Sequence, residues 1–178
     1  MIFWKFIISR NLRGKNCVFE SKKRISKSAK GAERIAELYS GAGTFTMALA
    51  KIAHVYAVDG DPALSRALST GAGRSRMGGR VTVETRDLAA RPLLPGELEG
   101  FDTVVLDPPR AGALRQVEQI VATPGVRRVV MVSCNPQTFA RDMRILVTAG
   151  FKPGPVLPVD QFPYSHHLEC VTTLIRGF

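Results

Sequence analysis

The sequence predicts an α/β fold in which a mostly parallel, seven-stranded sheet carries helices on both faces. From about Arg34 onward, short apolar runs of strand length alternate with segments in which apolar residues recur at helical spacing. Strands that alternate with helices form parallel sheets covered on both sides. The 178 residues, 45% of them hydrophobic, suit one domain of ordinary size.

Five apolar runs predict the parallel strands, at residues 35–39, 54–58, 80–84, 102–107 and 126–133. Two more runs, near residues 156–158 and 169–175, predict a final antiparallel pair. Helical spacing appears in three places, marked by Phe45, Leu49 and Ile52, by Leu64, Ala67 and Leu68, and by Phe139, Met143, Leu146 and Val147. The second of these helices begins at Asp61-Pro62, since proline is tolerated in a first turn.

Positive charge is concentrated near the start of the chain. Residues 1–34 carry ten Lys or Arg and two Asp or Glu, which gives eight of the ten net positive charges. We therefore expect a basic N-terminal segment at residues 1–33, disordered or a remnant, and a second domain at residues 34–178. The segment suits a polyanion such as RNA, or it is a solvated tail.

Cysteine and hydropathy patterns restrict the class of protein. The three cysteines are far apart and include no C-x-x-C pair, so no metal site is expected. Sparse cysteines suit a reducing cytoplasm. No apolar run reaches the roughly 18–20 residues of a membrane helix, so no membrane partner is expected.

Candidate ligand-binding residues follow the predicted strands. Ligands of open α/β sheets bind beyond the carboxyl ends of the strands. Gly41 and Gly43 follow the first strand, Asp59 the second and Asp87 the third. The glycines let a ligand approach the backbone, and Asp59 can hold ribose hydroxyls or simply cap a turn. A dinucleotide site would need a third glycine where Thr46 stands, which disfavours NAD.

Two further motifs follow the fourth and fifth strands. Asp107-Pro-Pro-Arg110 predicts a stiff turn that aims a carboxylate into the cleft. In Ser133-Cys-Asn-Pro136, Asn135 can cap a helix, so Cys134 would precede a helix N-terminus that favours its thiolate. Cys134 is a candidate nucleophile, or else a small buried hydrophobe.

Four motifs together resemble the RNA uracil-5 (5-methyluridine) methyltransferases. In chain order they are Glu-Leu-Tyr-Ser-Gly-Ala-Gly-Thr ending at Thr44, Asp-Pro-Pro-Arg ending at Arg110, Val-Ser-Cys-Asn-Pro ending at Pro136, and Phe-Pro-Tyr-Ser-His-His-Leu-Glu ending at Glu169. The resemblance covers residues 34–178. It implies a Rossmann-like class I methyltransferase fold, S-adenosylmethionine as cofactor, and transfer RNA or ribosomal RNA as substrate.

The resemblance also implies residue roles. Cys134 would be the nucleophile that adds to uracil, and Glu169 the base that removes the C5 proton. Contacts to S-adenosylmethionine would come from matching positions, namely Tyr39, Thr44, Asp59, Asp87 and Asp107. Adjacent strand residues face opposite ways, so His166 and His167 are expected to be structural or to contact RNA rather than to bind a metal.

The chain departs from the family in two respects. Relatives usually have an upstream domain, and a Phe-Gln-x-Asn stretch before the first strand; neither is found here. The expected function is methyl transfer to C5 of a uridine, and the chain would then be a catalytic domain truncated upstream. The alternatives are a non-catalytic fragment that binds RNA or cofactor, and an amino-group methyltransferase. The latter class usually has Asn-Pro-Pro-Tyr in place of Asp107-Pro-Pro-Arg110 and needs no cysteine.

Overall fold

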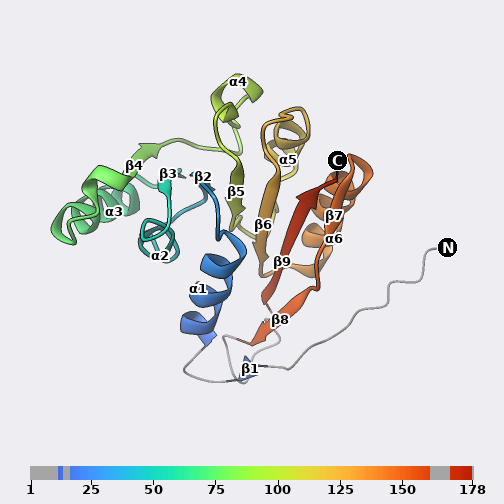
Figure 1. Ribbon diagram of the computed structural model, residues 1–178, viewed down its shortest axis with the longest axis horizontal. Coiled ribbons are helices and arrows are strands. Elements are labelled where there is room, and N and C mark those ends of the chain that lie inside the picture. Colours follow the sequence, from blue (N-terminus) through green and yellow to red (C-terminus); the bar gives the residue numbers. More distant parts are fainter. Residues whose placement is uncertain (1–11, 14–16, 161–168, 178) are drawn as a thin grey trace.

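The computed structural model describes residues 12–13, 17–160 and 169–177 (Figure 1). In this part of the chain, nine strands form one sheet in the order β1-β8-β9-β6-β5-β2-β3-β4, with β7 paired to β9. The strands are β1 Leu12–Arg13, β2 Arg34–Leu38, β3 His54–Asp59, β4 Val81–Thr85, β5 Thr103–Leu106, β6 Arg128–Ser133, β7 Phe151–Pro153, β8 Leu157–Asp160 and β9 Glu169–Arg176. The helices are α1 Cys17–Ser28, α2 Thr46–Leu49, α3 Pro62–Arg74, the 3-10 turn η1 Gly78–Arg80, α4 Pro95–Leu98, α5 Leu114–Val121 and α6 Pro136–Thr148.

The predicted α/β architecture is confirmed. Strands β2 to β6 pair in parallel, and β9 runs antiparallel to β6 and β8. The sheet has two strands more than the predicted seven. The additional strands, β1 and β7, have two and three residues, too few to produce a recognisable alternation of apolar and polar residues.

Helices cover both faces of the sheet, as predicted. One buried apolar cluster joins α4, α5 and α6 to strand residues such as Leu38, Leu106 and Met131. The other joins α1, α2 and α3 to the alternate strand residues, among them Ile35, Val105 and Val130. Figure 1 shows α5 and α6 beside β6 and β9, away from α2 and α3. We call the side of the sheet that carries α1, α2 and α3 the α1–α3 face.

Two helix starts form as predicted from local sequence. The Asp61 carboxylate accepts hydrogen bonds from the backbone N–H groups of Ala63 and Leu64, with Pro62 in the first turn of α3. Asn135 caps α6 by accepting a hydrogen bond from the N–H of Gln137, and Pro136 follows it. These side chains bond donors that a helix leaves unpaired at its start.

Helix lengths and exposed positions differ from the predictions. The helix after the glycine-rich turn is only the four residues of α2, and Ile52 lies beyond it with 40% of its surface exposed. Leu64 and Val147, which helped to mark the helical spacing, are also partly exposed, at 38% and 39%. Apolar side chains at helical spacing need not all be buried, because much of a folded surface is apolar.

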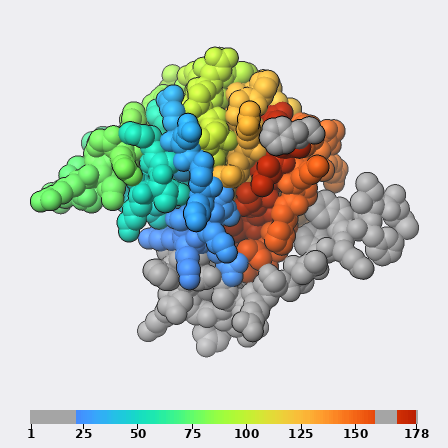
Figure 2. Space-filling model, viewed as in Figure 1, coloured from blue at the N-terminus to red at the C-terminus, as the bar shows by residue number. Residues whose placement is uncertain are grey.

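The N-terminal segment is partly described. Helix α1 lies within it, and Ile25 and Ala29 are fully buried in the cluster on the α1–α3 face. Lys23 and Lys27 are exposed on the same helix. The division at residue 34 stays a prediction. Figure 2 shows α1 against the body of the molecule, with α3 projecting at one end of the sheet. Within the described ranges, no helix is long and apolar enough to span a bilayer.

Candidate active site

The candidate residues gather at the carboxyl ends of the parallel strands. Strand residues alternate between the two faces of a sheet. Ala57, Val105, Val132 and Val171 all belong to the cluster on the α1–α3 face. Two positions further toward the carboxyl edge come Asp59 and Glu169, strand residues on this same face, and Asp107 and Cys134, the first residues after β5 and β6. Four candidates predicted from separate motifs thus converge on one edge of the sheet.

Cys134 and Glu169 lie opposite one another. In the antiparallel ladder between β6 and β9, the final pair is Ser133 with Cys170. Cys134 and Glu169 are the next residues outward, so they occupy facing positions just beyond this pair. The fold therefore brings together a thiol and a carboxyl group that are 35 residues apart in the sequence.

Cys170 is separated from this arrangement. It is buried in the cluster on the other face of the sheet, whereas Cys134 is half-buried at the carboxyl edge. Both thiols are free. Of these two thiols, Cys134 is therefore the more accessible.

Three of the carboxyl groups at this end of the sheet have raised pKa values. Burial raises the pKa of Asp107 to about 6. Burial and the nearby charge of Asp107 together raise the pKa of Glu169 to about 7. Burial also raises the pKa of Glu37 to about 8, and the charge of Asp107 adds to that rise. Asp107 therefore lies close enough to both glutamates to couple their ionisation.

Glu37 is a candidate that the sequence analysis quoted but gave no role. Its side chain is 1% exposed, and neither carboxyl oxygen has a hydrogen-bond partner among the described residues. Thr46 is near enough to moderate the rise in the Glu37 pKa, although its own buried hydroxyl also lacks a partner, as does that of Ser40. Unpartnered buried polar atoms are rare, and here they surround the glycine-rich turn.

The glycine-rich turn depends on backbone conformations that favour glycine. Gly41 and Gly43 have φ angles of 56° and 90°. A Cβ on Gly43 would lie 2.3 Å from Cδ1 of Leu68. The Asp59 carboxylate holds the turn by accepting hydrogen bonds from the N–H of Gly41 at 2.8 Å and of Asp61 at 2.9 Å. Asp59 therefore orders the turn directly, in addition to any contact with a ligand.

The other predicted cofactor residues border the same turn. Tyr39 has a φ of 64°, which is uncommon for a residue with a side chain and marks a constrained backbone. Burial, followed by the charges of Asp142 and Asp87, raises the pKa of its phenol to about 12. Asp87 is exposed and accepts hydrogen bonds from Ala89 and Ala90. Thr44 is exposed within the turn itself.

The loop that follows Asp107 is fastened to helix α6. The carbonyl of Arg110 accepts hydrogen bonds from Nδ2 of Asn135 and Oγ1 of Thr138. The buried Asp142 carboxylate accepts one from the N–H of Ala113 at 2.7 Å. Because α6 begins immediately after Cys134, these bonds fix the position of Asp107 relative to the thiol.

A glycine allows this close approach of loop and helix. Gly112 has a φ of 78°, and a Cβ there would lie 2.5 Å from Nη2 of Arg141 and 2.7 Å from Oδ2 of Asp142. Asn135 was predicted only as a helix cap, and Arg110 only as part of the turn after Asp107. The sequence indicated no role for Thr138, Asp142 or Gly112, because each acts through a contact between segments far apart in the chain. His166 and His167 lie outside the described residues.

Comparisons with known proteins agree with this geometry. A protein of Pyrococcus abyssi, described as a tRNA (uracil-54, C5)-methyltransferase in complex with S-adenosyl-L-homocysteine, superposes with a TM-score of 0.75 and 31% identity, over 89% of this chain and 38% of that one. The magnesium protoporphyrin IX methyltransferase of Synechocystis gives a TM-score of 0.67 at 18% identity, over 90% of this chain and 78% of that one, which supports the fold alone.

Sequence relatives point the same way. Residues 97–177 match the model of the tRNA (uracil-5-)-methyltransferase family. Proteins of Caulobacter vibrioides and Rhizobium meliloti, both described as uncharacterized RNA methyltransferases, are 50% and 47% identical over 83% and 80% of this chain. The chain spans only about a third of their length, 35% and 34% respectively.

The fold is that of the Rossmann-like class I methyltransferases, a class whose cofactor is S-adenosylmethionine. Residues 97–177 are similar to the tRNA (uracil-5-)-methyltransferase family, and the chain resembles RNA methyltransferases over most of its length.

The residues at the carboxyl edge fit S-adenosylmethionine. This cofactor carries positive charge on its sulfonium and ammonium groups, and the site contains three carboxyl groups. The unpartnered oxygens of Glu37, Ser40 and Thr46 offer acceptors beside the turn. A side chain at position 43 would collide with Leu68 of α3, so glycine lets the backbone stay close to this helix. These features suit a polar, cationic ligand at the turn.

We expect the Asp59→Ala variant to bind S-adenosylmethionine at least about tenfold more weakly than the wild type. The substitution removes acceptors for the N–H groups of Gly41 and Asp61, and each lost bond to a charged group costs about 1.5–3 kcal/mol. Isothermal titration calorimetry measures the change. Asp61→Ala is the matched control, since it removes the cap of α3 while leaving Asp59 intact; equal affinities in all three proteins would contradict the assignment.

Proposed function

We propose that the chain transfers a methyl group from S-adenosylmethionine to C5 of a uridine in transfer RNA or ribosomal RNA, through a covalent bond between Cys134 and the uracil. The facing positions of Cys134 and Glu169 beyond the β6–β9 ladder carry this proposal. An amino-group methyltransferase has no need of a thiol opposite a carboxylate. The free Cys134 thiol also suits the reducing cytoplasm, where we propose the protein acts.

Cys134 would activate the uracil. C5 of uracil is a poor nucleophile, and addition of a thiolate to C6 gives C5 the character of an enolate carbon. When bound, S-adenosylmethionine supplies an electrophilic methyl group on its sulfonium. The half-buried position of Cys134, directly before the N-terminus of α6, leaves the thiol accessible. An accessible base in RNA must first be unstacked.

Glu169 would complete the reaction. Once C5 carries the methyl group, its proton must leave before the bond between C6 and Sγ of Cys134 breaks. The electrons of the C5–H bond then re-form the C5–C6 double bond and expel the thiolate. The pKa of Glu169, about 7 because of burial and the charge of Asp107, suits a general base near neutral pH.

The remaining carboxyl-edge residues would hold the cofactor. We assign this role to Tyr39, Gly41, Gly43, Thr44, Asp59, Asp87 and Asp107. The hydrogen bond that Asp59 accepts from Gly41 and the bonds that fasten the loop after Asp107 to α6 support the assignment, because they restrict the positions of both carboxylates. Side chains that are already ordered lose less conformational entropy when a ligand binds, which lowers the cost of binding.

The fate of the C5 hydrogen of uridine shows which atom is methylated. With RNA transcribed from uridine labelled with tritium at C5, we expect one tritium released to water for each methyl group transferred. Scintillation counting of water and of RNA methylated from 14C-labelled S-adenosylmethionine gives both quantities. Methyl transfer without release of tritium would show that the acceptor is another atom, and no methyl transfer at all would favour a non-catalytic fragment.

A further inference from the structure

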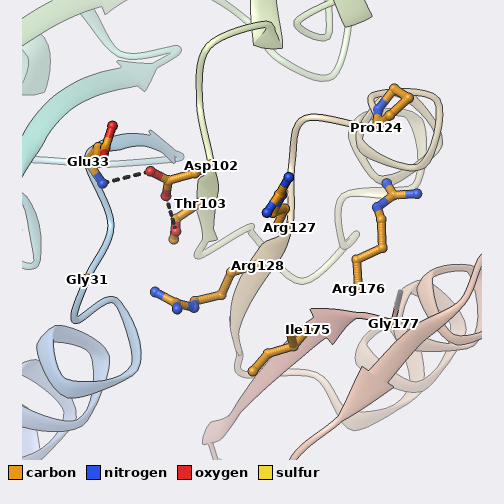
Figure 3. Close-up of a pocket in the computed structure, with 10 residues that line it drawn as sticks. All are labelled: Gly31, Glu33, Asp102, Thr103, Pro124, Arg127, Arg128, Ile175, Arg176 and Gly177. Atoms are coloured by element: carbon orange, nitrogen blue, oxygen red, sulfur yellow. Dashed lines mark hydrogen bonds between the residues drawn. The ribbon is translucent and has the colours of Figure 1, made fainter.

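A cavity opens at the opposite end of the sheet from Cys134. Its volume is about 560 Å³. It lies at the amino edge of the parallel strands, because its lining includes Thr103 at the start of β5 and Arg128 at the start of β6. Figure 3 shows Arg127, Arg128 and Arg176 around the hollow, with Glu33 and Asp102 on the far side.

A second cavity, of about 340 Å³, continues along the same edge. Arg34 and His54 open the strands β2 and β3 there, and Arg80 directly precedes β4. Adjacent strands lie about 4.8 Å apart. From β4 across to β9 the edge therefore extends for roughly 24 Å. Five arginines follow this edge, which we call the amino-edge arginines: Arg34, Arg80, Arg127, Arg128 and Arg176.

Neutral groups hold several of these arginines in place. Nη1 of Arg128 donates a hydrogen bond to the carbonyl of Lys30 at 3.1 Å. The guanidinium of Arg34 lies 5.0 Å from the centre of the Phe101 ring. Such contacts order a guanidinium without cancelling its charge, so they leave it prepared to bind an anion.

Arg176 is the most firmly fixed of the five. Its Nε donates to the carbonyl of Val126 at 3.1 Å, and its guanidinium lies 4.4 Å from the centre of the Phe151 ring. Its Nη2 donates hydrogen bonds to the carbonyls of Ile120 and Val121, at the end of α5, and of Thr123 just beyond the helix. Burial lowers the pKa of Arg176. A partly buried cation held by carbonyls supports a positive potential at the adjoining cavity.

Two acidic residues line the first cavity, Glu33 directly before β2 and Asp102 directly before β5. Both oxygens of the Asp102 carboxylate accept hydrogen bonds, Oδ2 from the N–H groups of Glu33 and Arg34 and Oδ1 from the hydroxyl of Thr103. Asp102 therefore serves to join β2 and β5. Among the residues that line the two cavities, five are arginines and two, Glu33 and Asp102, are acidic.

We propose that the amino-edge arginines form a second RNA-binding surface that holds backbone phosphates of the substrate away from the reacting uridine. Guanidinium groups match phosphate oxygens in geometry as well as charge, and an edge of roughly 24 Å accommodates several phosphates. The six residues of β6 separate this surface from Cys134 by about 20 Å. Such contacts position a nucleic acid without reading its sequence.

The second RNA-binding surface depends on the proposed methyl transfer in one respect, namely that RNA is the substrate. Equilibrium binding of the full chain to fluorescent transfer RNA and ribosomal RNA fragments, without S-adenosylmethionine, tests it separately from methyl transfer. For Arg127→Gln/Arg128→Gln we expect about tenfold weaker binding at 50 mM salt. The slope of log affinity against log salt should fall by roughly 1.5 for two lost phosphate contacts.

The matched control removes two positive charges elsewhere. Arg66 and Arg144 are exposed on α3 and α6 and line neither cavity, and Arg66→Gln/Arg144→Gln should keep more of the affinity and slope. Because Arg128 contacts Lys30, the exposed Arg127→Gln single variant is measured as well, with circular dichroism to verify folding. Equal losses in both double variants, or no loss in either, would overturn the proposal; retained RNA binding would point instead to a protein partner at this edge.

Discussion

The Cys134→Ala variant should lose methyl transfer by roughly 10⁴-fold or more, since removal of a catalytic nucleophile commonly has an effect of this size. It should also form no covalent bond to RNA. RNA that contains 5-fluorouridine should trap the wild-type protein, because fluorine cannot leave C5 as a proton does. Denaturing gels with labelled RNA detect the trapped species.

Glu169→Gln should show the opposite behaviour on such gels. An amide in this position cannot accept the C5 proton, whereas the thiol of Cys134 can still add to C6. We therefore expect methylated covalent protein–RNA species to accumulate on ordinary RNA, with little product released. The contrast between the two variants follows from their order in the reaction.

Cys170→Ala is the control for both variants. Cys170 is buried on the other face of the sheet, so its loss should lower stability while leaving the covalent bond to RNA intact. A Cys134→Ala protein that binds RNA and still methylates uridine would refute the covalent mechanism.

The second large effect concerns the stability of the protein as a function of pH. The pKa of Glu37 is about 8 in the folded protein and 4.5 for an unburied glutamate. Below about pH 4.5 both states hold the proton. As pH rises from there to about 8, the unfolded chain releases the proton and the folded chain keeps it, so stability falls. Above pH 8 the difference is constant.

The isosteric Glu37→Gln variant should lose much of this pH dependence. Between pH 5 and 8.5 we expect the wild-type free energy of unfolding to fall by about 3 kcal/mol more than that of the variant. Asp107 and Glu169 also have raised pKa values, so the variant should retain a smaller decline of the same sign.

Urea unfolding at a series of pH values measures this difference. The control is Glu118→Gln, which removes an exposed carboxylate on α5 and should follow the wild type. Identical pH profiles for the wild type and Glu37→Gln would show that Glu37 ionises normally in the folded protein.

Sequence alone determined the elements that local chemistry controls. The apolar runs that became β2 to β6 and β9, the Asp61 and Asn135 caps and the position of Gly41 and Gly43 in a turn all depend on neighbouring residues. The motif order also indicated a resemblance to the family whose model matches residues 97–177. The roles assigned to individual site residues stay predictions.

Only the tertiary structure decided how these residues meet. The pairing of Ser133 with Cys170 sets Cys134 opposite Glu169, and the bond from Ala113 to Asp142 holds the Asp107 loop on α6. The tertiary structure also buries the Glu37 carboxyl group without a hydrogen-bond partner among the described residues. It places the amino-edge arginines along one end of the sheet. The physical reason is that strand register, burial and the charge around a carboxyl group are properties of segments far apart in the chain, which local pattern does not encode.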